Sequence, residues 1–99
     1  MKKEESFKAY QMVSMYLMAL MGIERAFSTT KLSKVLSHDI KELTKVSDDL
    51  EEAFAVTDIE SEFKSFNRKN PIRIDMRELK EKMAAGYGVD LDKLEGVVR

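Results

Sequence analysis

The residue types best suited to catalysis lie together at positions 37 to 39. Ser37, His38 and Asp39 are consecutive, and His38 is the only histidine of the chain. A hydrolytic triad needs a serine, a histidine and a carboxylate that converge from separate places in the fold, beside an oxyanion hole. Consecutive residues of a helix point about 100° apart, so these three side chains would diverge. The pattern favours a solvated surface histidine over a catalytic one.

The acidic run at residues 48–52 is the strongest candidate for a cation site. A calcium loop would require a ladder of Asp or Asn ligands, a central glycine and a terminal glutamate, and this run lacks that order. The four glycines do not have the spacing of a phosphate-binding loop, and the chain has no cysteine for a disulfide, a thiolate ligand or a nucleophile. We therefore predict a protein that is not an enzyme and that needs no cofactor, metal ion or small-molecule substrate.

The apolar stretch at residues 10–23 is the element on which the rest of the chain is expected to pack. Eleven of its fourteen residues are apolar or aromatic. It is shorter than the roughly 20 apolar residues of a membrane span, and the mixed charges at residues 2–5 are unlike the start of a secretory signal. We expect a buried helix over residues 4–26, no membrane association and a cytoplasmic location.

Methionines recur at every third position of this stretch, so that their stripe slants around the helix. Met18 and Met21 project into an otherwise polar side. Either the rest of the domain covers them, with methionine filling gaps, or another chain does. We favour a second chain, because 99 residues are little material with which to surround a helix completely. The residues assigned to this interface are Met12, Met15, Met18, Met21 and Gly22.

A second long helix is expected over residues 31–55, where apolar residues follow one another at spacings of three and four. Such a narrow seam packs against one neighbour, which predicts an antiparallel hairpin with the first helix. Asp39 interrupts the seam, and residues 39–42 also have the form of a capping box. The helix therefore either continues or breaks at residues 37–39, and the unbroken periodicity favours continuity.

Shorter elements are expected after the hairpin. A capping box at residues 57–60 predicts a helix to about Arg68, and residues 71–75 alternate like a brief extended piece. Asp75 is the expected cap of a helix that ends at Gly86, and a last helix is expected over residues 91–97. The chain is thus predicted to be one all-α domain, 1–99. It would be a small helical bundle built on an antiparallel hairpin of two long helices plus two or three short C-terminal helices.

The alternative fold is helix-turn-helix or winged-helix-like, with a minimal β element near 71–76. It would make the protein a small DNA-binding regulator, and it requires the break at residues 37–39. Contacts to the groove would come from Lys41, Thr44 and Lys45, and contacts to phosphates from Lys64, Arg68, Lys69 and Arg73. The net charge of −1 and the acidic residues that follow Lys45 disfavour this alternative.

The preferred prediction is a non-enzymatic helical interaction or oligomerisation module. An apolar surface larger than the fold can cover usually marks an interface, and methionine adapts to partners of varied shape. The expected partner is a second copy of the chain, in a homodimer formed through the methionine-rich side of the first helix. Another helical protein is the other candidate.

Overall fold

The computed structural model describes residues 2–91, and within them the chain forms four α-helices and no strand. The helices are α1 (Lys3–Ala26), α2 (Leu32–Val56), α3 (Glu60–Lys69) and α4 (Met76–Gly86). The predicted all-α fold is confirmed. The β element of the alternative is not formed, because residues 71–75 connect α3 to α4 without a strand partner. The helix expected over residues 91–97 lies, apart from Leu91, outside the described residues.

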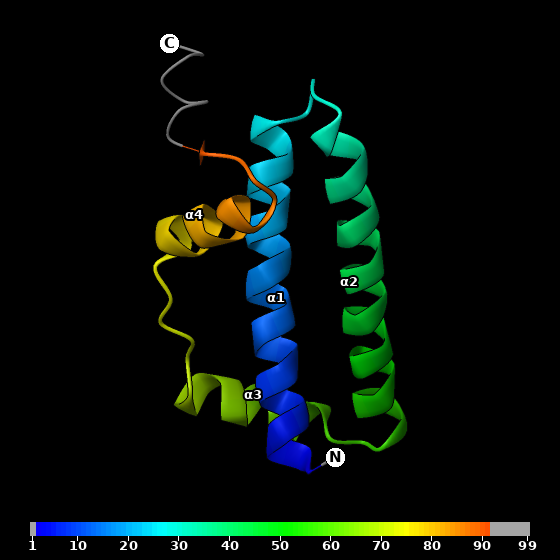
Figure 1. The fold of residues 1–99 in the computed structure, drawn as a ribbon. Coiled ribbons are helices and arrows are strands. Elements are labelled where there is room, and N and C mark those ends of the chain that lie inside the picture. The colour runs from blue at the N-terminus through cyan, green and yellow to red at the C-terminus, as the bar shows by residue number, and fades with distance from the viewer. Residues whose placement is uncertain (1, 92–99) are drawn as a thin grey trace.

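The two long helices, α1 and α2, run antiparallel and side by side, as Figure 1 shows. Helix α2 passes without interruption through residues 37–39, so the predicted continuity is confirmed and the helix-turn-helix alternative is wrong. The physical reason is the environment of Asp39, whose carboxylate accepts a hydrogen bond from the Tyr87 hydroxyl at 2.5 Å. The carboxylate is paired across the fold, and no break in the helix is needed to expose it.

An aliphatic core fills the end of the hairpin where α1 turns into α2. Ile23 of α1 and Leu36 of α2 are completely buried there, and α4 closes this core with Ala84. Helix α4 crosses α1 at this end, so it covers one side of α1 over its second half. The buried members of the core are Leu20, Ile23, Phe27, Leu36, Ala84 and Leu91.

An aromatic core fills the opposite end, where α3 lies across the start of α1 (Figure 1). The ring of Phe7 lies 5.3 Å, centroid to centroid, from the rings of Phe54, Phe63 and Phe66. Tilted and edge-on ring pairs of this kind each add about 0.5–1.5 kcal/mol beyond the burial of their area. Tyr10 joins the cluster through Phe63, at 5.0 Å. Helices α3 and α4 therefore cover different ends of α1, and among the described residues they do not pack against each other.

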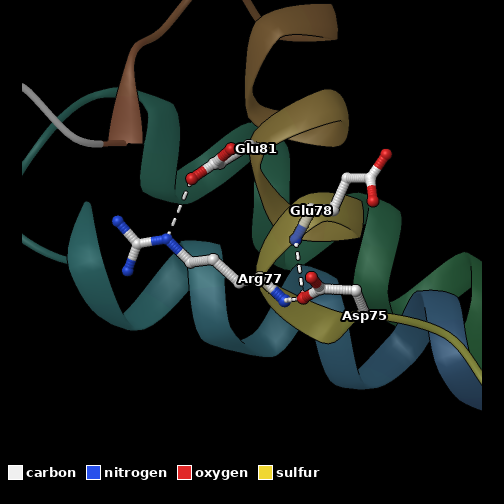
Figure 2. A network of polar contacts seen from close by, with 4 residues as sticks. All are labelled: Asp75, Arg77, Glu78 and Glu81. Carbon is white, nitrogen blue, oxygen red and sulfur yellow. Dashed lines mark hydrogen bonds and ion pairs between the residues drawn. The ribbon is translucent and has the colours of Figure 1, made fainter.

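The helix ends confirm the predicted cap and the predicted end of α4, and they correct one capping box. Asp75 caps α4, because its carboxylate accepts hydrogen bonds from the backbone N–H groups of Arg77 and Glu78 at 3.0 and 3.2 Å, as Figure 2 shows. The capping box at residues 57–60 is wrong: α3 begins at Glu60 without a side-chain cap, and Thr57 donates its hydroxyl hydrogen bond back to α2. Helix α4 ends at Gly86, as predicted, and the glycine with positive φ that follows it is Gly88.

Candidate protein–protein interface

Two of the four stripe methionines are the most exposed large apolar residues of α1. Met18 is 57% exposed and Met21 is 44% exposed, whereas Met12 is 36% exposed and Met15 is half-buried. Helices α2 and α4 bury Leu20 and Ile23 on the other sides of the same helical turns. The side of α1 that carries Met18 and Met21 is therefore not covered by any described part of the chain.

The spacing of residues on α1 separates the methionines into two groups. Ser14, Leu17, Met18 and Met21 follow the i, i+3, i+4, i+7 pattern of a single helical stripe. We call these four residues the methionine face. Met12 lies nine positions before Met21, which at about 100° per residue places it on the opposite side of α1. One flat contact can therefore cover Met18 and Met21 together but not Met12.

Gly22, next to this face, marks a close approach of α4. A Cβ atom added to Gly22 would lie 2.9 Å from Cδ of Lys80. The missing side chain thus makes room for the aliphatic part of the Lys80 side chain as it crosses α1. Gly22 therefore lies at a close helix crossing, and α1 continues past it in helical conformation to Ala26.

Other exposed apolar residues are more dispersed. Val35 and Val46 of α2 are 51% and 46% exposed, and Val56 at the end of α2 is exposed as well. Val35 and Val46 are eleven positions apart, which separates them by about 16 Å along the helix axis. Met18 and Met21 are neighbours across one helical turn and have Leu17 beside them. Adjacent apolar side chains form a patch, whereas single ones are normal on a protein surface.

Gln11 is a polar residue of α1 that the fold buries. It is 7% exposed, and its Nε2 atom donates hydrogen bonds to Oδ1 of Asn67 at 2.8 Å and to the carbonyl oxygen of Asn70 at 2.9 Å. These are the only three residues of the chain with amide side chains. Their scarcity was the one signal in the sequence that could have indicated a shared cluster. The contact fastens the end of α3 to α1.

Two tyrosine hydroxyls donate hydrogen bonds to carboxylates of α2. Tyr10 of α1 donates to Glu51 of α2, and this hydrogen bond, with some burial, raises the pKa of Tyr10. Tyr87 donates to Asp39, and burial together with that bond raises the pKa of Tyr87 to about 12. Both tyrosines therefore stay protonated far above neutral pH. They act as structural donors rather than as acids or bases in a reaction.

The residues of the catalytic pattern do not converge. Ser37 and His38 are exposed on α2, and Asp39 is held by Tyr87. Between residues 2 and 91, no group of three or more His, Asp or Glu side chains is arranged to hold a metal ion. None of the helices described is both long and apolar enough to cross a membrane.

A groove of about 650 Å³, open to solvent, lies between α1 and α3. Its rim carries Lys3, Lys8 and Lys69 together with Glu4 and Glu62, and Lys3 is paired with Glu62. Charges of both signs around an open groove select neither an anion nor a cation. The groove therefore points to no ligand class.

The residues of the DNA-binding alternative fall into two separate groups. Lys41 and Lys45 are exposed on α2, while the hydroxyl of Thr44 donates to the carbonyl oxygen of Ile40 in its own helix. The other four, Lys64, Arg68, Lys69 and Arg73, lie on α3 and the segment after it. Since α3 follows the far end of α2, the acidic residues 48–52 lie between the two groups along the chain. The arrangement does not supply one continuous basic surface.

No protein-family model matches this chain, and no curated protein or solved structure matches it either.

Proposed function

We propose that the protein is a non-enzymatic self-association module that forms a homodimer through the methionine face. The observation that carries the proposal is the exposure of Met18 and Met21, at 57% and 44%, in the most apolar helix of the chain. The cores at both ends of the hairpin are filled by other residues, so this face is surplus to the fold. Methionine is enriched in protein interfaces, where its flexible thioether adapts to the opposing surface.

The magnitude of the burial indicates how large the contact must be. Complete burial of a methionine side chain contributes roughly 1.5–3 kcal/mol, and about half of that is still available at each exposed methionine. Four such side chains in a dimer contribute on the order of 3–6 kcal/mol. Association itself costs an estimated 4–15 kcal/mol or more. The contact must therefore include Leu17 and part of α2 beside Met18 and Met21, and not the two methionines alone.

Two-fold symmetry gives a simple arrangement for such a contact. Each chain presents a two-helix hairpin, and two hairpins packed face to face make a four-helix core of the common antiparallel type. In a two-fold contact the same patch is used by both partners, so one methionine face supplies both halves of the interface. A helical partner other than a second copy would use the same face, and it would leave the isolated protein monomeric.

Charge insertion tests the proposal. Met18→Glu with Met21→Glu should give a folded monomer, because glutamates would meet their copies across the two-fold contact. The matched control is Met12→Glu, on the opposite side of α1, which should leave the dimer intact. Val35→Glu with Val46→Glu reports whether the contact includes that side of α2. Loss of helix content in the Met18, Met21 variant would instead mean that these side chains support the fold of the single chain.

A further inference from the structure

The sulfur chemistry of this chain is confined to methionine. The sequence contains seven methionines and no cysteine, so an oxidant finds thioethers and no thiols. Susceptibility of a thioether to peroxide follows its exposure to solvent. Among the described methionines, Met18 and Met21 are the most exposed, and Met83 is packed against the aliphatic core. Met18 and Met21 should therefore be the first methionines that peroxide oxidises.

We propose that Met18 and Met21 form a reversible oxidation site through which peroxide releases the dimer. This inference rests on the proposed self-association and adds its regulation. A lone pair of the thioether sulfur attacks one peroxide oxygen, and the O–O bond breaks with hydroxide as the leaving group. The hydroxide then takes the proton from the new S–OH group, which leaves the sulfoxide and one water molecule. The sulfur is oxidised by two electrons to the sulfoxide, and one peroxide molecule is reduced to water. Methionine sulfoxide reductases with a thiol reductant reverse the change.

The effect on association follows from the polarity of the product. A sulfoxide oxygen is a strong hydrogen-bond acceptor, and burying it without a donor is unfavourable. The neighbours of Met18 and Met21 on the same stripe are Ser14 and Leu17. The Ser14 hydroxyl is engaged, because it donates to the carbonyl oxygen of Tyr10 at 2.9 Å. Each buried sulfoxide should therefore weaken the dimer about tenfold or more.

Oxidation of Met18 and Met21 and formation of the dimer also oppose each other by mass action. The methionine face is open in the single chain and covered in the dimer, so the single chain is the species that reacts. Oxidation of Met18 and Met21 should slow as the protein concentration rises through the dissociation constant. Met12 lies on the opposite side of α1, so its rate should not depend on concentration. Met12 is thus an internal reference of similar chemistry on the same helix.

The experiment treats the full chain with dilute hydrogen peroxide at several protein concentrations. Peptide mass spectrometry follows each methionine, and light scattering gives the mass of the assembly before and after treatment. We expect Met18 and Met21 to oxidise several-fold faster than Met83 in dilute protein, and the oxidised protein to be monomeric. Incubation with the reductases should restore the dimer. The control is Met18→Leu with Met21→Leu, which keeps the apolar volume and should stay dimeric in peroxide.

The outcomes separate this inference from the proposed function. A dimer that persists with Met18 and Met21 fully oxidised overturns the regulation and leaves the self-association in place. Equal oxidation of Met83 and Met18 overturns the selectivity of the site. Dissociation of the Met18→Leu, Met21→Leu variant in peroxide would mean that oxidation of another methionine releases the dimer, which overturns the assignment of the site to Met18 and Met21. Untreated protein that is monomeric at every concentration overturns both proposals.

Discussion

The hydroxyl of Tyr87 donates a 2.5 Å hydrogen bond to Oδ2 of Asp39, and this contact joins the residue after α4 to the first half of α2. Both residues are half-buried. The bond explains how a carboxylate is tolerated in the apolar seam of α2, and it connects α4 to a helix other than α1. The position of α4 therefore depends on this polar pair as well as on the aliphatic core.

Replacement of Tyr87 by phenylalanine should lower the free energy of unfolding by about 1 kcal/mol at neutral pH, because the Asp39 carboxylate loses its donor. Chemical denaturation followed by circular dichroism measures the change. Tyr16→Phe is the matched control, since the Tyr16 hydroxyl makes no hydrogen bond within residues 2–91. An equal effect of the two substitutions would show that the Tyr87 hydroxyl contributes nothing specific.

The same variant should alter the alkaline limb of the stability curve. The pKa of Tyr87 is raised to about 12 in the fold, whereas an unfolded tyrosine titrates near 10. The unfolded chain therefore loses its proton first, so the contribution of Tyr87 is complete below pH 10 and is lost as the pH rises to 12. Tyr87→Phe should flatten this decline without abolishing it, because the pKa of Tyr10 is raised too. An unchanged slope between pH 10 and 12 would contradict the assignment.

Gln11 should be sensitive to any change that removes its amide donors. Gln11→Leu keeps the buried volume but leaves the Asn67 side chain and the Asn70 carbonyl without their partner, which should cost about 1–3 kcal/mol. Hydrogen exchange should show the largest loss of protection in α3. Ser14→Ala is the control, because its hydroxyl bonds only within α1. A stable Gln11→Leu variant would mean that water replaces the amide at no cost.

Gly22→Ala should stabilise the protein by about 0.5 kcal/mol. Alanine is close to 1 kcal/mol better than glycine inside a helix, and the group in its way is the flexible side chain of Lys80. Thermal unfolding measures the gain, with Gly86→Ala as the comparison, since a Cβ atom there meets nothing within 4 Å. Destabilisation by Gly22→Ala would show that α4 cannot adjust at the crossing.

Mixed-sequence duplex DNA should not bind, even at low salt. The acidic residues 48–52 separate the basic groups of α2 and α3 and would repel the phosphate backbone. Fluorescence anisotropy with a labelled duplex measures this directly. Binding that weakens steeply with added salt would restore the DNA-binding alternative, with Lys64 and Arg68 as the first residues to replace.

The periodicity of the sequence is sufficient to predict the two long helices but not the contacts between helices. Both long helices begin and end within one residue of the predicted bounds, because amphipathic spacing and the hydroxyl residues Ser28, Thr29 and Thr30 between the helices are local signals. The hydrogen-bond partners of Asp39 and Gln11 could not be predicted from local periodicity, since each partner is 48 to 59 positions away in the chain. Local hydropathy assigns a polar residue to solvent unless the distant group that satisfies it is known.

The candidate interface was partly visible in the sequence. Met18 and Met21 were recognised because they stand on the polar side of an apolar helix, and the structure leaves both exposed. The three-residue period of the methionines also groups Met12 with them. A three-residue period drifts around a helix of 3.6 residues per turn, however, and this places Met12 on the opposite side of α1. The coverage of each position by α2, α3 and α4 depends on the tertiary arrangement.

The most direct test of the central claim is the solution mass of the unmodified chain, measured by light scattering over a wide range of protein concentrations. We predict the mass of two chains at high concentration, a decline toward one chain on dilution, and one chain throughout for Met18→Glu with Met21→Glu. A mass of one chain at every concentration would contradict self-association through the methionine face.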